Sequence, residues 1–259
     1  MLIDFFKYQG TGNDFIILDN RTGAFNELTE EQINFMCNRK KGIGADGLMM
    51  LNTSIEFDFE MIYFNADGKA GSMCGNGGRC MIRFVDSLGI HKHIYRFYAA
   101  DGEHLAEIAD NIIRLKMNDV NAIEQHTRYS FVNTGSPHYV RFVDDVKSYD
   151  VVQNGREIRN SSKFKEEGVN VNFVQHVDED TIYVRTYERG VEDETLSCGT
   201  GVTAAALVAA HNETGFNLVE VKTSGGNLSV EFDKMSEERF QNIWLCGPAV
   251  FVFKGSIEV

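Results

Sequence analysis

Two copies of one short cysteine–glycine motif constrain the fold of this chain more than any other feature. Cys-Gly-x-Gly occurs at residues 74–77 and again at residues 198–201, which places the copies 124 positions apart in a chain of 259 residues. Other residues match at or within one position of this offset: Tyr63 with Tyr187, Gly102 with Gly226, Glu107 with Glu231, and residues 12–16 with 135–139. Matches on both sides of a motif indicate a duplicated unit. We therefore expect two similar lobes of roughly 120–130 residues, a common size for one domain.

Short strands and a few helices are expected around these motifs. Residues 57–61 alternate apolar and polar side chains, as a half-buried strand does. One helix should begin after Thr29, which forms a capping box with Gln32. A second should run from about Asn76 to Leu88, and a third, apolar all round and hence buried, from about Thr200 to His211. The other expected strands are Phe15–Leu18, Leu48–Leu51, Ile94–Ala99, Ile112–Met117, His138–Val143, Thr181–Tyr187, Leu228–Phe232 and Ala249–Phe253.

The charge balance argues against two classes of main partner. Asp and Glu number 38 against 25 Lys and Arg, which gives a formal net charge of −13. A surface this negative disfavours nucleic acid and anionic membranes. The longest uncharged stretch near a motif runs from Thr195 to Ala210 and is shorter than the ~20 apolar residues that span a bilayer. The first residues do not show a basic-then-apolar pattern, so we expect no signal peptide.

The cysteine pattern fits a reducing compartment. The chain has five cysteines, an odd number, at wide spacing and without a Cys-x-x-Cys pair. This arrangement fits neither a secreted disulfide framework nor a zinc site, so we expect no metal and a cytoplasmic location. Cys37, Cys80 and Cys246 lack a glycine context and are expected to be packing residues.

Cys74 and Cys198 stand in a different context, directly before a predicted helix. The start of a helix offers unpaired backbone N–H groups and a partial positive charge, which bind carboxylates. The glycines allow those amides to approach a ligand closely, and the same amides stabilise a thiolate. One such cysteine per lobe suggests two thiols that face each other across a cleft.

Two facing thiols suit the inversion of a carbon centre by proton transfer. One face of the carbon needs a base and the other an acid, and a thiolate–thiol pair supplies both. The carbanion-like transition state can be stabilised at the α-carboxylate by the helix N-termini. Neither motif contains a lysine for a Schiff base, so no cofactor is expected.

Several segments together resemble the diaminopimelate epimerases over essentially the whole chain. The resemblance implies a mixed α/β (α+β) fold of two pseudo-symmetric lobes, each a central helix wrapped by strands. It implies lobes at residues 1–118 and 119–247, with 248–259 returning to the first. It also implies the interconversion of LL- and meso-diaminopimelate in lysine and peptidoglycan biosynthesis. The segments are GTGNDF at 10–15, GIGADG at 42–47, NADG at 65–68, MCGNGGRC at 73–80, VNV at 169–171, YERG at 187–190 and CGTG at 198–201.

The resemblance also implies residue roles. Cys74 and Cys198 match the catalytic cysteines of the family, and His138 matches a histidine near the catalytic glutamate and thiol. A guanidinium such as that of Arg189 suits a distal carboxylate. By their residue types alone, Asn13 and Asn65 could equally be turn residues, and His138 an ordinary strand residue. The matched substrate positions are Gly75, Asn76, Gly199 and Thr200 at the reacting carboxylate, Asn13 and Glu188 at the reacting amino group, and Asn65, Asn170 and Arg189 at the distal end.

Three positions depart from the family pattern. Gly47 stands where glutamine is frequent, Ser136 where asparagine is common, and Gly168 where arginine is frequent. None of them touches the motif cysteines, so the departures bear on the choice of substrate more than on the proton transfer.

Other functions remain open at this point. A proline-racemase-like enzyme shares paired cysteines, but that family has histidine where Asn76 stands. A thiol–disulfide redox protein would use Cys74 and Cys198 as a dithiol. A non-catalytic amino-acid binder would need the helix starts and no thiols. The expected partner is a small-molecule substrate, and a homodimer is expected for the assembly.

Overall fold

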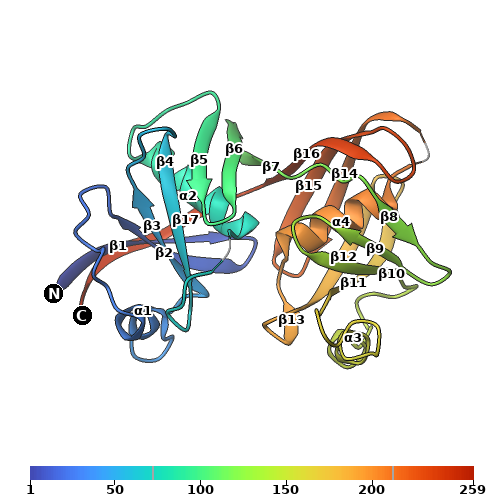
Figure 1. Cartoon of the computed structure of the whole chain (residues 1–259), viewed down its shortest axis with the longest axis horizontal. Helices are drawn as coiled ribbons and strands as arrows, with labels where there is room; N and C mark the ends of the chain where they lie inside the picture. The colour runs from blue at the N-terminus through green and yellow to red at the C-terminus, as the bar shows by residue number, and fades with distance from the viewer. Residues whose placement is uncertain (72, 212) are drawn as a thin grey trace. The chain divides into compact units, whose positions relative to one another are not determined.

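The fold was obtained as a computed structural model, which describes residues 1–71, 73–211 and 213–259. Two compact units divide the chain (Figure 1). The first, here called the N-lobe, is Met1–Leu115 together with Pro248–Val259. The second, the C-lobe, is Lys116–Gly247.

The N-lobe combines a continuous sheet with two helices. Its strands are β1 (Leu2–Gly10), β2 (Asn13–Asp19), β3 (Gly47–Asn52), β4 (Phe59–Asn65), β5 (Tyr95–Ala99), β6 (Gly102–Ala109), β7 (Ile112–Lys116) and β17 (Val250–Glu258), and its helices are α1 (Glu30–Cys37) and α2 (Gly75–Ser87). They pair in the order β17–β1–β2–β3–β4–β5–β6–β7. The pairs β2–β3 and β4–β5 are parallel, and the others are antiparallel.

The C-lobe repeats this plan. Its elements are β8 (Ile123–Gln125), β9 (Ser130–Asn133), β10 (Pro137–Phe142), α3 (Val151–Arg159), β11 (Asn170–Asp178), β12 (Thr181–Glu188), β13 (Asp193–Thr195), α4 (Gly199–Ala209), β14 (Gly215–Thr223), β15 (Gly226–Lys234) and β16 (Phe240–Gly247). The strands pair in the order β8–β9–β10–β11–β12–β14–β15–β16, and β13 adds to β12. Here β10–β11 and β12–β14 are the parallel pairs.

The two sheets therefore have the same sequence of parallel and antiparallel neighbours. Each parallel pair is joined by a crossover that contains a helix, as parallel strands require: α1 and α3 in the first crossover, α2 and α4 in the second. The last strand, β17, pairs with β1 as β8 pairs with β9. The expected fold, two pseudo-symmetric α/β lobes, is confirmed.

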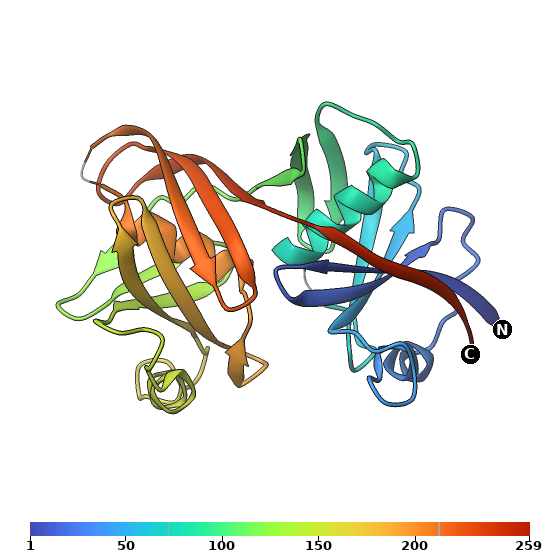
Figure 2. The same cartoon turned by 180° about the vertical axis from the view of Figure 1, so that it is seen from behind.

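Helix α2 in one lobe and α4 in the other are central, and the strands of each lobe wrap around them (Figure 1, Figure 2). Most residues of α4 are buried, which confirms the expectation from its apolar composition. Its glycine and alanine residues let strands approach closely on every side. No helix in the described part of the chain is long and apolar enough to cross a bilayer.

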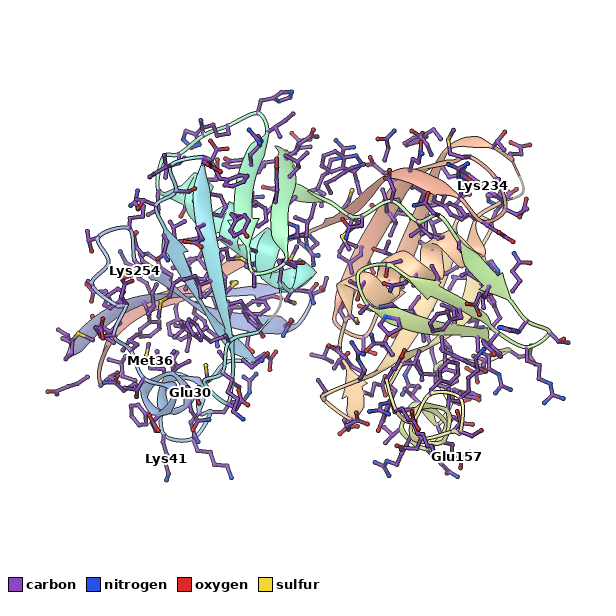
Figure 3. All side chains as sticks on the ribbon, viewed as in Figure 1. Glu30, Met36, Lys41, Glu157, Lys234 and Lys254 are labelled. Atoms are coloured by element: carbon purple, nitrogen blue, oxygen red, sulfur yellow. The ribbon has the colours of Figure 1, made fainter. Side chains whose placement is uncertain are left out.

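Helix α1 is explained by its local sequence. Thr29 accepts a hydrogen bond from the Gln32 amide, and the Gln32 side chain accepts one from the Thr29 amide, so the expected capping box is present. Met36 points from α1 toward the sheet of the N-lobe, whereas Lys41 points to solvent (Figure 3). Ile33 and Met36 join the apolar core formed with β1, β2 and β3.

Some elements differ from the sequence-based expectation. The strand expected from residue 57 begins at Phe59, and α3 was not expected at all. Gly155 lies in the middle of α3, where glycine weakens a helix. A Cβ at this position would lie 2.4 Å from the Cβ of Tyr187, so glycine is required for α3 to pack on β12.

Candidate functional site

Each motif cysteine lies at the N-cap of the central helix of its lobe. Cys74 precedes Gly75 of α2 with φ −107° and ψ 126°, and Cys198 precedes Gly199 of α4 with φ −115° and ψ 114°. The cysteine carbonyls accept the first helical hydrogen bonds, at 2.7 Å and 2.8 Å. Neither thiol caps its helix in the way that a serine or aspartate side chain would. The first amides of both helices are thus positioned to bind an anion.

The second glycine of each motif lies where a side chain would meet a close neighbour. A Cβ on Gly77 would lie 3.0 Å from the sulfur of Met49, and one on Gly201 would lie 2.4 Å from Oδ1 of Asn172. The contact at Gly201 is too short for a Cβ, whereas the contact at Gly77 is tight but meets the end of a flexible side chain. Both glycines thus let the helix start lie close to a neighbouring strand.

In the N-lobe, three of the expected site residues are brought together. Cys74 Sγ lies 3.5 Å from Asn13 Oδ1, and Asn76 Nδ2 donates to the same oxygen at 3.4 Å. Asn13 Nδ2 donates to Asp46 at 2.6 Å, which fixes the orientation of the amide. Asn76 is held in turn by Arg79, whose Nη2 donates to Asn76 Oδ1 at 2.8 Å from a fully buried side chain.

An ion-pair network anchors this arrangement. Arg39 bridges Asp14 and Asp46 at 2.6 Å and 2.7 Å, and Lys7 lies 2.7 Å from Asp14. Burial alone would raise the pKa of Asp14, but hydrogen bonds from Arg39 and Lys7 outweigh it and hold the pKa at about 2. The Asp46 carboxylate that orients Asn13 is therefore held by Arg39, which also binds Asp14 next to Lys7.

Asn65 lies at the same edge of the N-lobe sheet, without a hydrogen bond to Asn13 in the structure. Gly47 pairs with Phe15 of β2 on one side and with Asn65 of β4 on the other, so the three strand ends are aligned. A Cβ on Gly47 would lie 2.5 Å from the ring of Tyr63. The ring thus occupies the space into which a glutamine at this position would grow.

In the C-lobe, a line of polar side chains leads to the second motif cysteine. Cys198 Sγ lies 3.5 Å from Thr200 Oγ1, which lies 3.2 Å from Ser136 Oγ. Ser136 Oγ is 2.9 Å from Nε2 of His138, and Nδ1 of His138 is 3.0 Å from Nδ2 of Asn172. The structure therefore places His138 two hydroxyl groups away from the thiol.

His138 is a neutral side chain in this line. It is 0% exposed. Burial, together with the positive charge of Arg189, lowers the pKa of its imidazole to about 3, although the hydrogen bond with Asn172 opposes the shift. At neutral pH one ring nitrogen therefore donates and the other accepts.

The residues matched to the distal end of the substrate lie beside this line. Asn170 is 4% exposed and accepts a hydrogen bond from the Arg189 amide at 2.9 Å. The Arg189 side chain is exposed and donates to the carbonyl of Glu167 at 2.9 Å. Glu188 accepts a hydrogen bond from Thr195 at 2.9 Å. These positions leave the Arg189 guanidinium accessible to a ligand.

The departure at Gly168 has a structural counterpart. Gly168 has φ +75°, which favours glycine, and a Cβ there would lie 2.6 Å from Cδ of Arg189 and 2.9 Å from Cζ of Arg159. Arg159, which pairs with Glu192 at 3.4 Å, occupies the space beside this backbone. A side chain at position 168 would displace one of these guanidinium groups.

The remaining cysteines are packing residues, as expected. Burial raises the pKa of the Cys37 thiol to about 12 and also raises the pKa of Cys80. Cys246 is buried as well. The raised pKa keeps the thiols of Cys37 and Cys80 protonated, so these two do not act as nucleophiles or bases.

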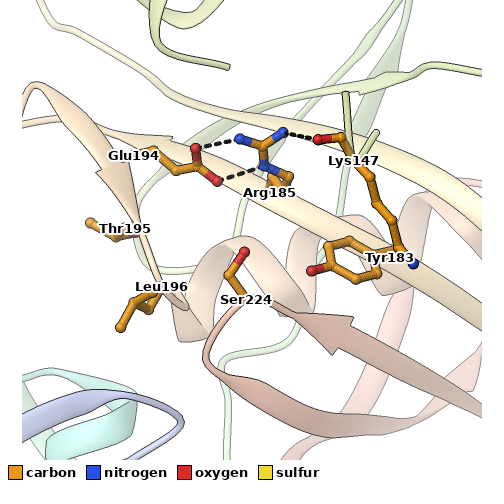
Figure 4. A pocket seen from close by; sticks show the side chains of 7 residues that line it. All are labelled: Lys147, Tyr183, Arg185, Glu194, Thr195, Leu196 and Ser224. Carbon is orange, nitrogen blue, oxygen red and sulfur yellow. Dashed lines mark hydrogen bonds and ion pairs between the residues drawn. The ribbon is translucent and has the colours of Figure 1, made fainter. Parts of the chain in front are cut away.

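A surface hollow of about 520 Å³ lies elsewhere in the C-lobe (Figure 4). Arg185 and Glu194 face each other on its wall through two hydrogen bonds of 2.6 Å, and Arg185 also donates to three backbone carbonyls. None of the expected site residues lines it. Its lining residues are Lys147, Tyr183, Arg185, Glu194, Thr195, Leu196 and Ser224.

Sequence reasoning missed the side chains that support the site. Asn172 and Thr186 lie outside every motif, and only the fold brings them together behind the start of α4. Asp46 and Arg79 lie within the GIGADG and MCGNGGRC segments, but no role was expected for either side chain. Among the described residues, no group of His, Cys, Asp and Glu is arranged to hold a metal ion.

The solved structures most useful for comparison share the fold and little sequence. A phenazine biosynthesis protein of the PhzF family from Bacillus anthracis matches with a TM-score of 0.74 at 17% identity, and all of both chains is covered. A hydroxyproline epimerase from Agrobacterium vitis matches with a TM-score of 0.67 at 12% identity, covering 99% of this chain and 91% of the other. At such identities the likeness is one of fold alone.

Sequence comparisons are more specific. The family model described as diaminopimelate epimerase matches residues 5–123 and 130–252. The diaminopimelate epimerase of Flavobacterium psychrophilum is 47% identical over 97% of this chain and 99% of its own length. That of Chlorobaculum tepidum is 46% identical over 96% and 99%. The chain therefore belongs to the diaminopimelate epimerase family, and it is an isomerase of the epimerase type.

Proposed function

We propose that this protein interconverts LL- and meso-diaminopimelate by proton transfer between its two motif cysteines. The observation that carries the proposal is the repeated helix start: each lobe presents one cysteine at the N-cap of its central helix, with nearly the same backbone angles. Relatives that carry the name diaminopimelate epimerase align with almost the entire chain, which supports this choice of substrate.

The chemistry follows from one thiol acting on each face of the α-carbon. A thiolate takes the α-proton from one face, and the thiol of the other cysteine delivers a proton to the opposite face, which inverts the centre. The two cysteines exchange roles for the reverse reaction. Cys74 and Cys198 are the proposed catalytic residues, and the reaction needs no cofactor and no metal.

The helix starts stabilise the charge that develops. As the α-proton leaves, electron density moves onto the reacting carboxylate, where preorganised amides bind it more tightly. We assign this role to the first amides of the helices, at Gly75, Asn76, Gly199 and Thr200. Because the helices are buried and fixed, their dipoles need no reorganisation during the reaction.

The substrate is longer than the reacting centre, and the remaining residues are assigned to its two ends. Asn13 and Glu188 contact the reacting amino group. Asn65, Asn170 and Arg189 hold the distal amino acid, where the guanidinium pairs with the distal carboxylate. His138 supports the site without contacting the substrate, since it is fully buried.

The cellular setting is part of the proposal. The small-molecule substrate and the net charge of −13 support a cytoplasmic enzyme of lysine and peptidoglycan precursor biosynthesis that binds neither nucleic acid nor membranes.

We further propose a homodimer formed through β17. Four consecutive apolar residues, Val250–Phe253, are 44–51% exposed on this strand. Side chains alternate between the two faces of a strand, so the run presents apolar groups on both faces of β17. Exposed apolar groups of this kind mark interfaces, and a second copy can cover one of these faces with the same surface. Sedimentation should give a dimer for the wild type and a monomer for Phe251→Lys. A wild-type protein that sediments as a monomer at micromolar concentration contradicts the dimer.

Deuterium incorporation tests the reaction. In D₂O the delivering thiol carries deuterium from the solvent, so newly formed epimer should carry one deuterium at the α-carbon from the first turnover. The unreacted isomer should remain largely protiated at low conversion. Mass spectra of the separated isomers decide the question, with L-proline as the control substrate. Protium in the early product, or racemisation of L-proline in place of diaminopimelate, would contradict the proposal.

A further inference from the structure

A chain of hydrogen bonds runs from Asn172 through His138, Ser136 and Thr200 to Cys198, and is here called the polar line. The donor and the acceptor of its first hydrogen bond, at Asn172, can be assigned. Asn172 Nδ2 donates to the carbonyl of Tyr139 at 3.1 Å, and because a carbonyl only accepts, this contact fixes the amide orientation. Thr186 donates to Asn172 Oδ1 at 2.9 Å, which agrees with it. Nδ2 of Asn172 therefore also donates to Nδ1 of His138. Since the imidazole is neutral, its hydrogen lies on Nε2.

The donor and acceptor roles of the Ser136 hydroxyl follow from this assignment. Its Oγ accepts from Nε2–H of His138 at 2.9 Å and from Nδ2 of Asn170 at 3.2 Å. The orientation of Asn170 is fixed, because its Oδ1 accepts the backbone N–H of Arg189. A serine hydroxyl has two acceptor positions and one hydrogen. With both acceptor positions used, the hydrogen of Ser136 goes to Oγ1 of Thr200, 3.2 Å away.

The line ends on sulfur. Because Thr200 Oγ1 receives the hydrogen of Ser136, its own hydrogen is available for Cys198 Sγ at 3.5 Å. A hydroxyl that donates to sulfur favours the thiolate over the thiol, since a hydrogen bond to an ionised acceptor is stronger than one to a neutral acceptor. The start of α4 favours the thiolate at the same place.

The N-lobe presents the opposite polarity to its cysteine. Asn13 Nδ2 is engaged by the Asp46 carboxylate, so the group that faces Cys74 is the oxygen Oδ1, at 3.5 Å. An acceptor oxygen favours the protonated thiol, which can donate to it. The two cysteines share a backbone geometry and differ in the hydrogen-bonding groups that meet them.

We propose that Ser136 is a positioning residue that aims this hydroxyl line at Cys198, so that the resting enzyme holds Cys198 as the thiolate and Cys74 as the thiol. The inference rests on the proposed two-cysteine function and adds a resting assignment of acid and base. The described titratable and charged side chains near this end of the C-lobe include His138 on β10, Glu188 at the end of β12 and Arg189 directly after it. The Arg159–Glu192 ion pair lies beside Arg189.

The pH dependence of alkylation tests the assignment. The reduced, substrate-free enzyme is labelled briefly with iodoacetamide between pH 5 and 10, and the modification of each cysteine is quantified by peptide mass spectrometry. The midpoint of each rate profile reports thiolate formation and is independent of how accessible the sulfur is. We expect a lower midpoint for Cys198 than for Cys74 in the wild type. Ser136→Ala should raise the Cys198 midpoint by about one pH unit, a tenfold loss of thiolate at neutral pH, and leave Cys74 unchanged.

Three further variants complete the test. Ser136→Thr keeps a hydroxyl and should restore the wild-type midpoint, and Thr200→Val removes the last donor and should reproduce the shift independently. Thr134→Val is the matched control, because Thr134 donates to the carbonyl of Thr200 at 2.9 Å and has no part in the line to sulfur. It should leave the midpoint unchanged.

The outcomes separate this inference from the proposed function. A Cys198 midpoint at or above that of Cys74, or an unshifted midpoint in both Ser136→Ala and Thr200→Val, overturns the inference. If the wild type incorporates deuterium into diaminopimelate in that case, the proposed function stands without it. The reverse result is also informative. If the midpoints shift as expected but the protein leaves diaminopimelate unchanged, the proposed function is overturned and the thiolate assignment stands.

Discussion

At the scale of residues, the two cysteines are alike in backbone and unlike in surroundings. Phe15 and Met49 lie behind the start of α2, where His138 and Asn172 lie behind the start of α4. Duplication of the lobe has thus preserved the position of the thiol while the side chains behind it differ. An enzyme that inverts a centre needs an acid on one face and a base on the other, so unlike surroundings for the two thiols suit the task.

Each cysteine should be indispensable for epimerisation. In Cys74→Ala or Cys198→Ala, one face of the α-carbon loses its proton donor or acceptor, and we expect turnover to fall by about 10²–10⁴-fold, the usual contribution of a positioned acid or base. Cys37→Ala, which removes a buried thiol elsewhere in the N-lobe, serves as the control. Turnover can be followed by separating the isomers. Near-normal turnover in either variant would remove that cysteine from the mechanism.

The buried histidine should make stability depend on pH. Below about pH 6.5 the unfolded chain binds a proton at His138, whereas the folded chain keeps the imidazole neutral down to about pH 3. The contribution of His138 to the free energy of unfolding should therefore be largest above pH 6.5. It should fall on acidification by up to about 1.4 kcal/mol per pH unit. Urea unfolding at pH 6.5, 5.5 and 4.5 gives the slope. His138→Gln should show a shallower one, and equal slopes would contradict the assignment.

The motif cysteines could be proposed from the sequence because the features that point to them are local. A cysteine in a glycine-rich motif before a helix is defined by its immediate neighbours. Ser136, Asn172 and Thr186 lie on three different strands, β10 with its preceding turn, β11 and β12, and they meet only after these strands have paired. Their roles therefore depend on register, which a single sequence does not reveal.

At the scale of elements, α1 is determined by local sequence, whereas α3 depends on a contact that forms only in the folded chain. The capping box that starts α1 lies within four residues, so the sequence predicts it. Helix α3 depends on the close approach of Gly155 to Tyr187 in β12, a contact between residues 32 positions apart. In that helix glycine is a packing residue, although in isolation it counts against a helix.

The second motif glycines offer a matched pair of substitutions. Gly201→Ala directs a Cβ at Oδ1 of Asn172, which is held by Thr186, so the contact cannot relax without breaking a buried hydrogen bond. Gly77→Ala meets the flexible sulfur of Met49 instead. We expect a loss of about 1–3 kcal/mol for Gly201→Ala, as for other overpacked sites, and a smaller loss for Gly77→Ala. Urea unfolding of both variants makes the comparison, and an equal or larger loss in Gly77→Ala would contradict it.

At the scale of the whole molecule, the strand order of one lobe depends on a distant part of the chain. The N-lobe sheet begins with β17, which pairs with β1 from Leu2 to Gln9. Ile257 and Val259 pack against the core formed by β1, β2, β3 and α1. The internal repeat predicts two lobes, but the return of the last strand was an implication of the family resemblance, since nothing in residues 250–258 alone indicates which sheet they join.

Removal of β17 should therefore affect one lobe. A chain that ends at Ala249 leaves β1 paired with β2 alone. We expect hydrogen exchange of the β1 amides that faced β17 to accelerate at least about tenfold, because an unpaired edge opens readily. The amides of β15 in the C-lobe should change little. Lys254→Ala, an exposed substitution on β17 (Figure 3), is the control and should leave both unchanged. Equal acceleration in the two lobes would contradict this division.

The late position of β17 has a consequence for protein synthesis. Domains usually fold in order as the ribosome releases them, the N-terminal one first. Here the strand that completes the first lobe is translated only after the whole second lobe. Synthesis proceeds at about 5–20 residues per second. While the C-lobe is being made, the nascent N-lobe therefore has an open β1 edge and an incomplete core. The first lobe in the sequence is thus the last to complete its sheet. Until then it exposes an open strand edge, which is the kind of surface that promotes aggregation during synthesis.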